Sequence, residues 1–143
     1  MELGGDTKAV LLAAGLIFLG ALVLGVWKYR QMAASPEGQA HTYVDVAHRA
    51  ALLYSFATLL IAVFVELSGW STAVNLVASF AVIAFFVGAI SGYIFHGIKK
   101  DTDNQFREGD GAPGLHPFMW TLIVVEIAGF GVLFAGFVSE QIL

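Results

Sequence analysis

The sequence predicts an all-α fold: an integral membrane four-helix bundle with the N- and C-termini on the same side of the membrane. Of its 143 residues 58% are hydrophobic and only 13% are charged, whereas a soluble domain has roughly 25% charged residues. The apolar residues also gather in four runs of about 20 or more, enough for each to cross a bilayer as a helix. These spans are 9–27, 48–68, 71–98 and 117–137, and they form a single transmembrane domain over residues 1–143.

The connections between the spans are unequal in length. The first span follows an acidic segment and precedes no small-residue cleavage site, so we expect a retained helix and not a secretory signal. Only Gly69 and Trp70 join the second and third spans, which predicts a tight antiparallel hairpin with Ser71 or Thr72 as the N-cap. The fourth span begins near Pro117, because proline suits the first turn of a helix.

The basic residues predict the orientation. Apart from Lys8, every Lys and Arg lies in or beside the two longer loops, namely Lys28, Arg30, Arg49, Lys99, Lys100 and Arg107. The positive-inside rule therefore places both loops in the cytoplasm and both termini outside, in a multi-pass protein of the inner membrane. No basic patch suggests binding to nucleic acid. Membrane lipid is the partner expected around the four apolar spans.

Small residues spaced four apart predict close helix contacts, either within the bundle or between subunits of an oligomer. These residues are Ala84, Gly88 and Gly92, then the pair Ala21 and Gly25, and the pair Gly131 and Ala135. The chain has no cysteine, which excludes disulfides, iron–sulfur clusters and thiolate ligands.

Polar side chains at membrane depth are the candidate functional residues, because each is costly unless it is paired or ligated. They are His48, Arg49, Tyr54, Tyr93, His96 and Glu126. A hairpin folded about residues 70–71 pairs positions whose numbers sum to about 141, so it sets His48 level with Tyr93. Tyr54 lies about 9 Å deeper, and Glu126 lies near the middle of the bilayer.

Each candidate has a structural and a functional interpretation. His48 is either an interfacial histidine bonded to a carbonyl or headgroup, or a haem ligand with Arg49 and Arg30 near the propionates. His96 is either a second axial ligand or a donor to a loop carbonyl. Tyr54 and Tyr93 are either packed aromatics or donors to a bound oxygen. Glu126 is either a pocket residue or one end of an interhelical hydrogen bond.

Several motifs of the chain resemble those of the styrene oxide isomerase family, which are small four-helix membrane proteins. The resemblance begins with Ser35-Pro36-Glu37-Gly38 and continues with Ala47-His48 at the head of the second span. The separation from His48 to Tyr93 also matches the family's His and Tyr. Later matches are Asn104-Gln105-Phe106, Gly109-Asp110 and Phe130-Gly131-Val132-Leu133.

The resemblance implies a haem b (iron) with His48 as its single axial ligand, in a homotrimer. It implies isomerisation of an aryl epoxide, a small hydrophobic substrate, to an aldehyde by a 1,2-hydride shift, with ferric iron as the Lewis acid. Tyr93 matches the family's pocket tyrosine, and Tyr54 stands where the family has an asparagine. Two alternatives remain: a haem protein that transfers electrons or senses a gas, and a non-catalytic small membrane subunit.

Overall fold

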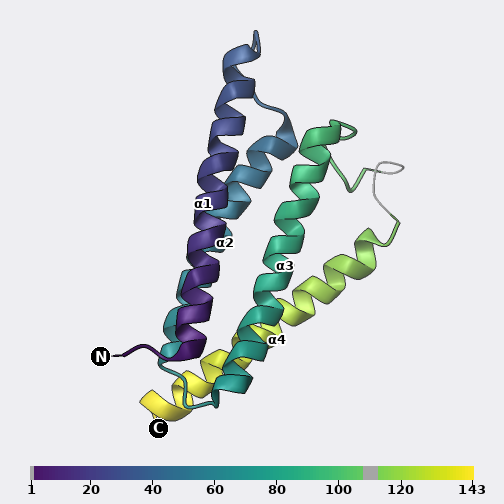
Figure 1. Cartoon of the computed structure of the whole chain (residues 1–143). Helices are drawn as coiled ribbons and strands as arrows, with labels where there is room; N and C mark the ends of the chain where they lie inside the picture. Colours follow the sequence, from purple (N-terminus) through teal and green to yellow (C-terminus); the bar gives the residue numbers. More distant parts are fainter. Residues whose placement is uncertain (1, 108–112) are drawn as a thin grey trace.

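The computed structural model describes residues 2–107 and 113–143, and this part of the chain is helical with no strand. The helices are α1 (Gly5–Ala34), α2 (Thr42–Glu66), α3 (Thr72–Lys99) and α4 (Leu115–Gln141). All four are long and apolar enough to cross a membrane, as the helices of a multi-pass membrane protein are. Figure 1 shows both chain ends at the end of the molecule that holds the α2–α3 turn.

Helix α1 is longer than the predicted span 9–27. Its 30 residues extend about 45 Å, which exceeds the roughly 30 Å of hydrocarbon in a bilayer. The helix ends where Ser35 turns to extended backbone, as a residue before proline does. Gly38 then takes a positive φ of 67°, which glycine adopts without strain, and the chain turns back toward α2.

Helix α2 begins six residues before the predicted span. Its N-cap is His41, whose side chain accepts a hydrogen bond from the backbone N–H of Tyr43. A histidine is not among the preferred caps, and the predicted span 48–68 did not include it. At the other end of the hairpin the predicted cap Ser71 is confirmed, since its side chain accepts a bond from the N–H of Val74.

The predicted pairing of α2 with α3 is confirmed by ring contacts. Tyr54 stacks on Phe86 with ring centroids 4.3 Å apart, and these two numbers sum to 140, close to the expected 141. Helix α1 packs along α2 through fully buried Val10 and Ala21. The core therefore lies mainly between α1, α2 and α3.

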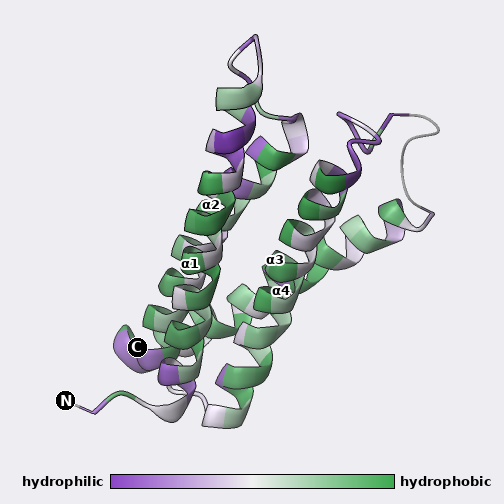
Figure 2. Cartoon of the chain, turned by 45° about the horizontal axis from the view of Figure 1, so that its top comes forward, coloured by the Kyte–Doolittle hydropathy of each residue, from purple (hydrophilic) through white to green (hydrophobic). Residues whose placement is uncertain are grey.

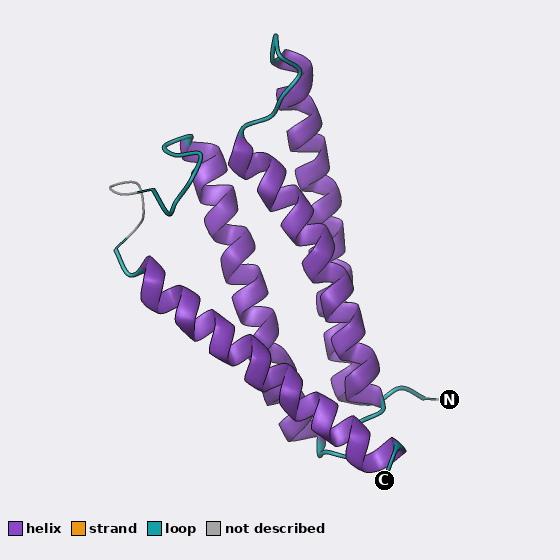
Figure 3. Ribbon diagram, turned by 180° about the vertical axis from the view of Figure 1, so that it is seen from behind, coloured by secondary structure: helices purple, strands orange, loops and turns teal. Residues whose placement is uncertain are grey.

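Helix α4 crosses α3 and diverges from it toward the loop end, as Figures 1 and 3 show. The crossing lies at Gly129, where an added Cβ would be 2.5 Å from Val82 and 3.0 Å from the carbonyl oxygen of Ala78. Within the described residues α1 and α4 do not touch, so the bundle is open on one side. The predicted pair Gly131 and Ala135 is exposed and is not a contact within the chain.

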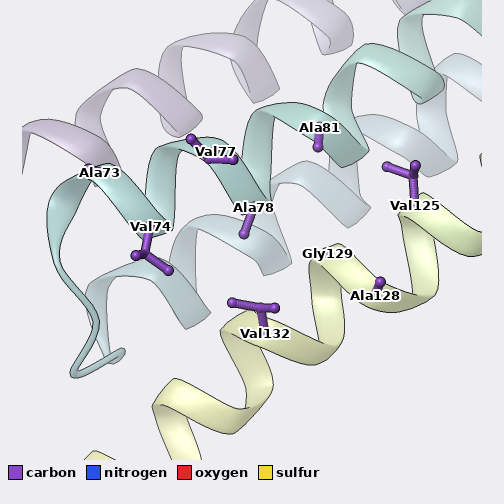
Figure 4. A pocket seen from close by; sticks show the side chains of 9 residues that line it. All are labelled: Ala73, Val74, Val77, Ala78, Ala81, Val125, Ala128, Gly129 and Val132. Carbon is purple, nitrogen blue, oxygen red and sulfur yellow. The ribbon is translucent and has the colours of Figure 1, made fainter.

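The surface of the helices is apolar, as the green ribbons of Figure 2 show. Val77, Ile127 and Leu53 are each about 70% exposed, at 73%, 71% and 71%, which is the exposure expected of side chains that face lipid. At the crossing, an apolar groove of about 530 Å³ lies between α3 and α4 (Figure 4). Its walls carry only Ala, Val and Gly.

Hydrogen bonds between buried polar groups join three helices at the end that holds the termini. Asn75 of α3 donates to the carboxylate of Asp6 in α1 at 3.0 Å. The hydroxyl of Thr7 donates to Glu66 of α2 at 2.6 Å. Such bonds satisfy groups that would otherwise be costly at membrane depth, and they fix the end of α1 against the hairpin.

Candidate functional site

His48 faces α1 and is half-buried. Its Nδ1 lies 2.9 Å from the carbonyl oxygen of Ala21. One turn along α1, a Cβ added at Gly25 would lie 2.9 Å from Cε1 of the imidazole, so the glycine makes room for the ring. The predicted small pair Ala21 and Gly25 is thus a contact between α1 and α2.

This hydrogen bond determines which nitrogen of His48 carries the proton. A carbonyl oxygen only accepts hydrogen bonds, so Nδ1 must be the donor, and in the neutral imidazole Nε2 then keeps its lone pair. Histidines that bind a metal usually have this arrangement, with one ring N–H bonded to a carbonyl or carboxylate and the other nitrogen on the metal. His48 therefore has the bond to a carbonyl that the structural interpretation predicts, and also the tautomer that a ligand requires.

Charged groups surround His48 on the loop side. Asp45 is bonded to Lys28 of α1 at 2.5 Å and to Arg49 at 2.8 Å. The side chain of Arg49 is 64% exposed, and Arg30 is exposed as well, so both have N–H groups free for carboxylates. Sequence reasoning missed Asp45, although its position four residues before Arg49 was a signal for this pair.

An apolar cavity of about 510 Å³ lies between α1 and α3 on the deeper side of His48. Its walls include Leu24, the neighbour of Gly25, and Ala51, one turn deeper than His48 on α2. His48 itself does not line this cavity. Its volume falls within the roughly 300–1,000 Å³ of cofactor and ligand pockets.

These residues supply part of what a haem b would require of a protein. The residues supply an imidazole with a free Nε2, apolar walls one turn deeper, and exposed guanidinium groups on the loop side for the propionates. His48 would hold the iron, and Arg49 and Arg30 would hold the propionates. The described residues contain no cluster of three His, Cys, Asp or Glu that would hold a bare metal ion.

A second polar group lies between α2 and α3, around Tyr43. The ring of Tyr43 stacks on Tyr93 at 6.0 Å and lies 5.2 Å from His96. Nδ1 of His96 is 2.8 Å from Oδ1 of Asp101, so this histidine bonds a loop carboxylate in place of the expected loop carbonyl. The hydrogen bond from His96 holds the pKa of the Asp101 carboxyl below its usual value.

The loop motif that carried part of the resemblance has a structural role here. The hydroxyl of Tyr43 accepts a hydrogen bond of 2.6 Å from the backbone N–H of Gln105. The side chain of Asn104 accepts one of 3.0 Å from the N–H of Phe106. The motif therefore anchors the loop on α2. Gly109 and Asp110 lie outside the described residues.

Three further candidates, Tyr54, Tyr93 and Glu126, belong to α2, α3 and α4. Among the described residues neither tyrosine hydroxyl has a hydrogen-bond partner, and Oε1 of Glu126 is buried without one. Toward the loop end, α3 and α4 enclose a cavity of about 300 Å³ that Tyr93 and His96 line.

The structure therefore separates the predicted site residues into two groups. The first, against α1, holds His48, Arg49 and Arg30; the second, toward α3 and α4, holds Tyr54, Tyr93, His96 and Glu126. We find no hydrogen bond or ring contact between the groups in the part of the chain that the structure describes. Six residues advance a helix by about 600°, so Tyr54 points about 120° away from His48 around α2.

Comparison of the chain with known protein families, with curated proteins and with solved structures finds no match. The candidate site is therefore defined by its own residues and geometry.

Proposed function

We propose that the chain is a membrane haem b protein with His48 as the axial ligand, and that it isomerises an aryl epoxide to an aldehyde. The observation that carries the proposal is the hydrogen bond of 2.9 Å between His48 Nδ1 and the carbonyl of Ala21. It holds the imidazole in the tautomer whose Nε2 is free to bind iron. The epoxide isomerase activity is supported by the resemblance of the motifs described above.

In this proposal the haem supplies a Lewis acid for the epoxide oxygen. The chain supplies Tyr93 and Tyr54, whose hydroxyls have no partner among the described residues and are free to donate to a bound oxygen. Because the two tyrosines and His48 are on different sides of α2 within one chain, the substrate must reach both sides, which a homotrimer would allow at its subunit contacts. We further propose the inner membrane as the location, with the long loops cytoplasmic and the termini outside.

Electron transfer or gas sensing through two histidine ligands receives less support from the geometry. His96 is the other candidate ligand, and its Nδ1 is bonded to Asp101 on the side of α3 that borders the loop cavity. A single histidine ligand leaves one face of the iron open to an oxygen substrate, as the isomerase requires. The non-catalytic alternative predicts a protein without haem, so an absorption spectrum distinguishes it from the two haem-binding functions.

Absorption spectroscopy of the detergent-purified protein, with and without dithionite, tests the haem. We expect a Soret band that His48→Ala abolishes and His96→Ala retains. Gly25→Ala should reduce haem content severalfold, because the added Cβ meets the imidazole, whereas Gly15→Ala, which meets nothing within 4 Å, should not. A folded wild-type protein without a Soret band, after expression with ample haem, would disprove the proposal.

Conversion of styrene oxide to phenylacetaldehyde tests the reaction. Epoxide and aldehyde have the same atoms and electrons, so turnover should need no added reductant. Loss of one hydrogen bond to a developing oxyanion costs about 10²–10³ in kcat, and we expect Tyr93→Phe to lose activity on that scale while it keeps the Soret band. A haem-replete protein with no turnover of aryl epoxides would leave the haem assignment standing and contradict the isomerase.

A further inference from the structure

His96 and Asp101 form a hydrogen-bonded pair at the loop end of α3. Nδ1 of His96 lies 2.8 Å from Oδ1 of Asp101, and the two side chains are 10% and 40% exposed. The bond lowers the pKa of the Asp101 carboxyl, so this group is ionised at neutral pH and can only accept hydrogen bonds. Nδ1 of His96 is therefore the donor, and in the neutral imidazole Nε2 is an acceptor.

The imidazole of His96 is also held by two aromatic rings. The ring centroid of Tyr43 lies 5.2 Å from that of His96, and the ring of Phe95 packs against it edge-on at 5.6 Å. The hydrogen bond made by one ring nitrogen determines the role of the other. Because its neighbours already order the ring, a ligand that bonds to Nε2 does not have to immobilise it first.

Nε2 of His96 has an unused capacity for a hydrogen bond. Within the described residues no hydrogen bond reaches it, and the buried side-chain atoms that lack a partner there are Asn75 Oδ1 and Glu126 Oε1. Because Nε2 is not one of these buried atoms, it keeps some accessible surface. His96 lines the cavity of about 300 Å³ between α3 and α4, and a ligand can meet Nε2 from there.

The walls of this cavity suit a small, flat, apolar molecule. On α3, Gly88 and Gly92 stand one turn apart and leave the helix surface without side chains, and a Cβ added at Gly92 would meet nothing within 4 Å. On α4, Phe118 and Met119 line the cavity, and both kinds of side chain pack well against an aromatic ring. The volume is at the small end of ligand pockets, so we expect a ligand of about one ring.

We propose that the cavity between α3 and α4 binds a small phenol, whose hydroxyl group donates a hydrogen bond to Nε2 of His96. The ring of the phenol lies between the glycines of α3 and the apolar side chains of α4. A carboxylic acid fits less well, because at neutral pH it is ionised, has no proton to donate and is repelled by Asp101. An epoxide and an aldehyde have no O–H group either, so this ligand class is distinct from that of the proposed isomerisation.

Equilibrium dialysis of carbon-14 phenol against the detergent-purified full chain tests the site, with protein-free micelles as the blank. Anisole, in which a methyl ether replaces the hydroxyl group, is the matched probe. We expect saturable binding of phenol, about tenfold tighter than that of anisole, because only phenol can donate to the buried acceptor. Benzoate should bind more weakly than phenol.

Two pairs of variants locate the site. His96→Phe should remove the preference for phenol, and His116→Phe should keep it, because His116 is exposed and does not line the cavity. Gly92→Leu should fill the cavity and abolish the binding of both probes. Gly131→Leu should bind them as the wild-type protein does, since Gly131 also has open space around it but lies outside the cavity.

The comparison of phenol with anisole uses the wild-type protein alone, so it tests the proposal even if His96→Phe does not fold. Equal affinities for the two probes, tighter binding of benzoate, or no saturable binding of phenol would overturn the proposal. So would a folded His96→Phe protein that still prefers phenol. His48→Ala should bind phenol as tightly as the wild-type protein whether or not haem is found, which separates this test from that of the proposed function.

Discussion

His48 and His96 show how the partner of one ring nitrogen decides what a histidine can do. His48 donates from Nδ1 to a carbonyl of α1, and this bond leaves Nε2 unused. His96 donates to the carboxylate of Asp101 in the loop after α3. The sequence predicted the height of both residues along their helices, because rise per residue is fixed. It did not predict their directions around the helix: it set His48 level with Tyr93, and the imidazole faces Ala21 of α1.

The hydrogen bond between His96 and Asp101 leads to a prediction for a single residue. His96→Ala removes the main cause of the lowered pKa of Asp101, so the pKa should rise toward its ordinary value. In the wild-type protein the bond stabilises the fold at pH values above the ordinary pKa of an aspartate carboxyl. This stabilisation is lost as the pH falls through the lowered pKa of Asp101. Carbon-13 NMR titration of the carboxyl carbon measures the change. An unchanged pKa in the variant would show that the bond is absent in solution.

At the scale of elements, the crossing of α3 and α4 depends on one glycine. Small residues four apart predicted a contact at Gly131 and Ala135, within the bundle or between subunits. Within the chain the contact lies at Gly129, with Gly136 against Ser68 and Trp70. The spacing reveals that a helix has small residues on a face. It does not reveal which face of the helix the neighbouring helix packs against, because that depends on the angle at which the two helices cross. The hairpin was predictable because its connection is short: five residues, 67–71, separate α2 from α3, and such short connections join antiparallel neighbours.

Gly129→Ala and Gly131→Ala form a matched pair that tests this crossing. Both replacements gain about 1 kcal/mol of helix propensity. Only the first adds a Cβ that meets Val82 and the backbone of Ala78, whereas the second meets nothing within 4 Å. Overpacking costs about 1–3 kcal/mol, so Gly129→Ala should unfold at lower temperature than Gly131→Ala in the same detergent. Equal melting temperatures would contradict the crossing.

For the whole molecule, polar groups divide between the two ends. The end with the termini is held by hydrogen bonds among Asp6, Thr7, Glu66 and Asn75. The other end carries every Lys and Arg of the chain except Lys8, partly paired with Asp45 and Asp103. Four helices with both chain ends together were predictable from hydropathy alone. The open side along α4 was not, because no pattern within one helix specifies how far the next helix diverges from it.

This asymmetry predicts the orientation of the protein in its membrane. Basic loops are retained in the cytoplasm during insertion, so the loop before α2 should be inside and the end of α4 outside. Because the chain has no cysteine, Gln39→Cys and Ser139→Cys each introduce a single thiol at an exposed position. In intact cells with a permeable outer envelope, an impermeant maleimide should label the second variant and not the first, and disruption of the inner membrane should expose both. Labelling of the Gln39 variant alone in intact cells would reverse the topology, and it would place the polar groups around His48 and the mouth of the α3–α4 cavity at the outer face.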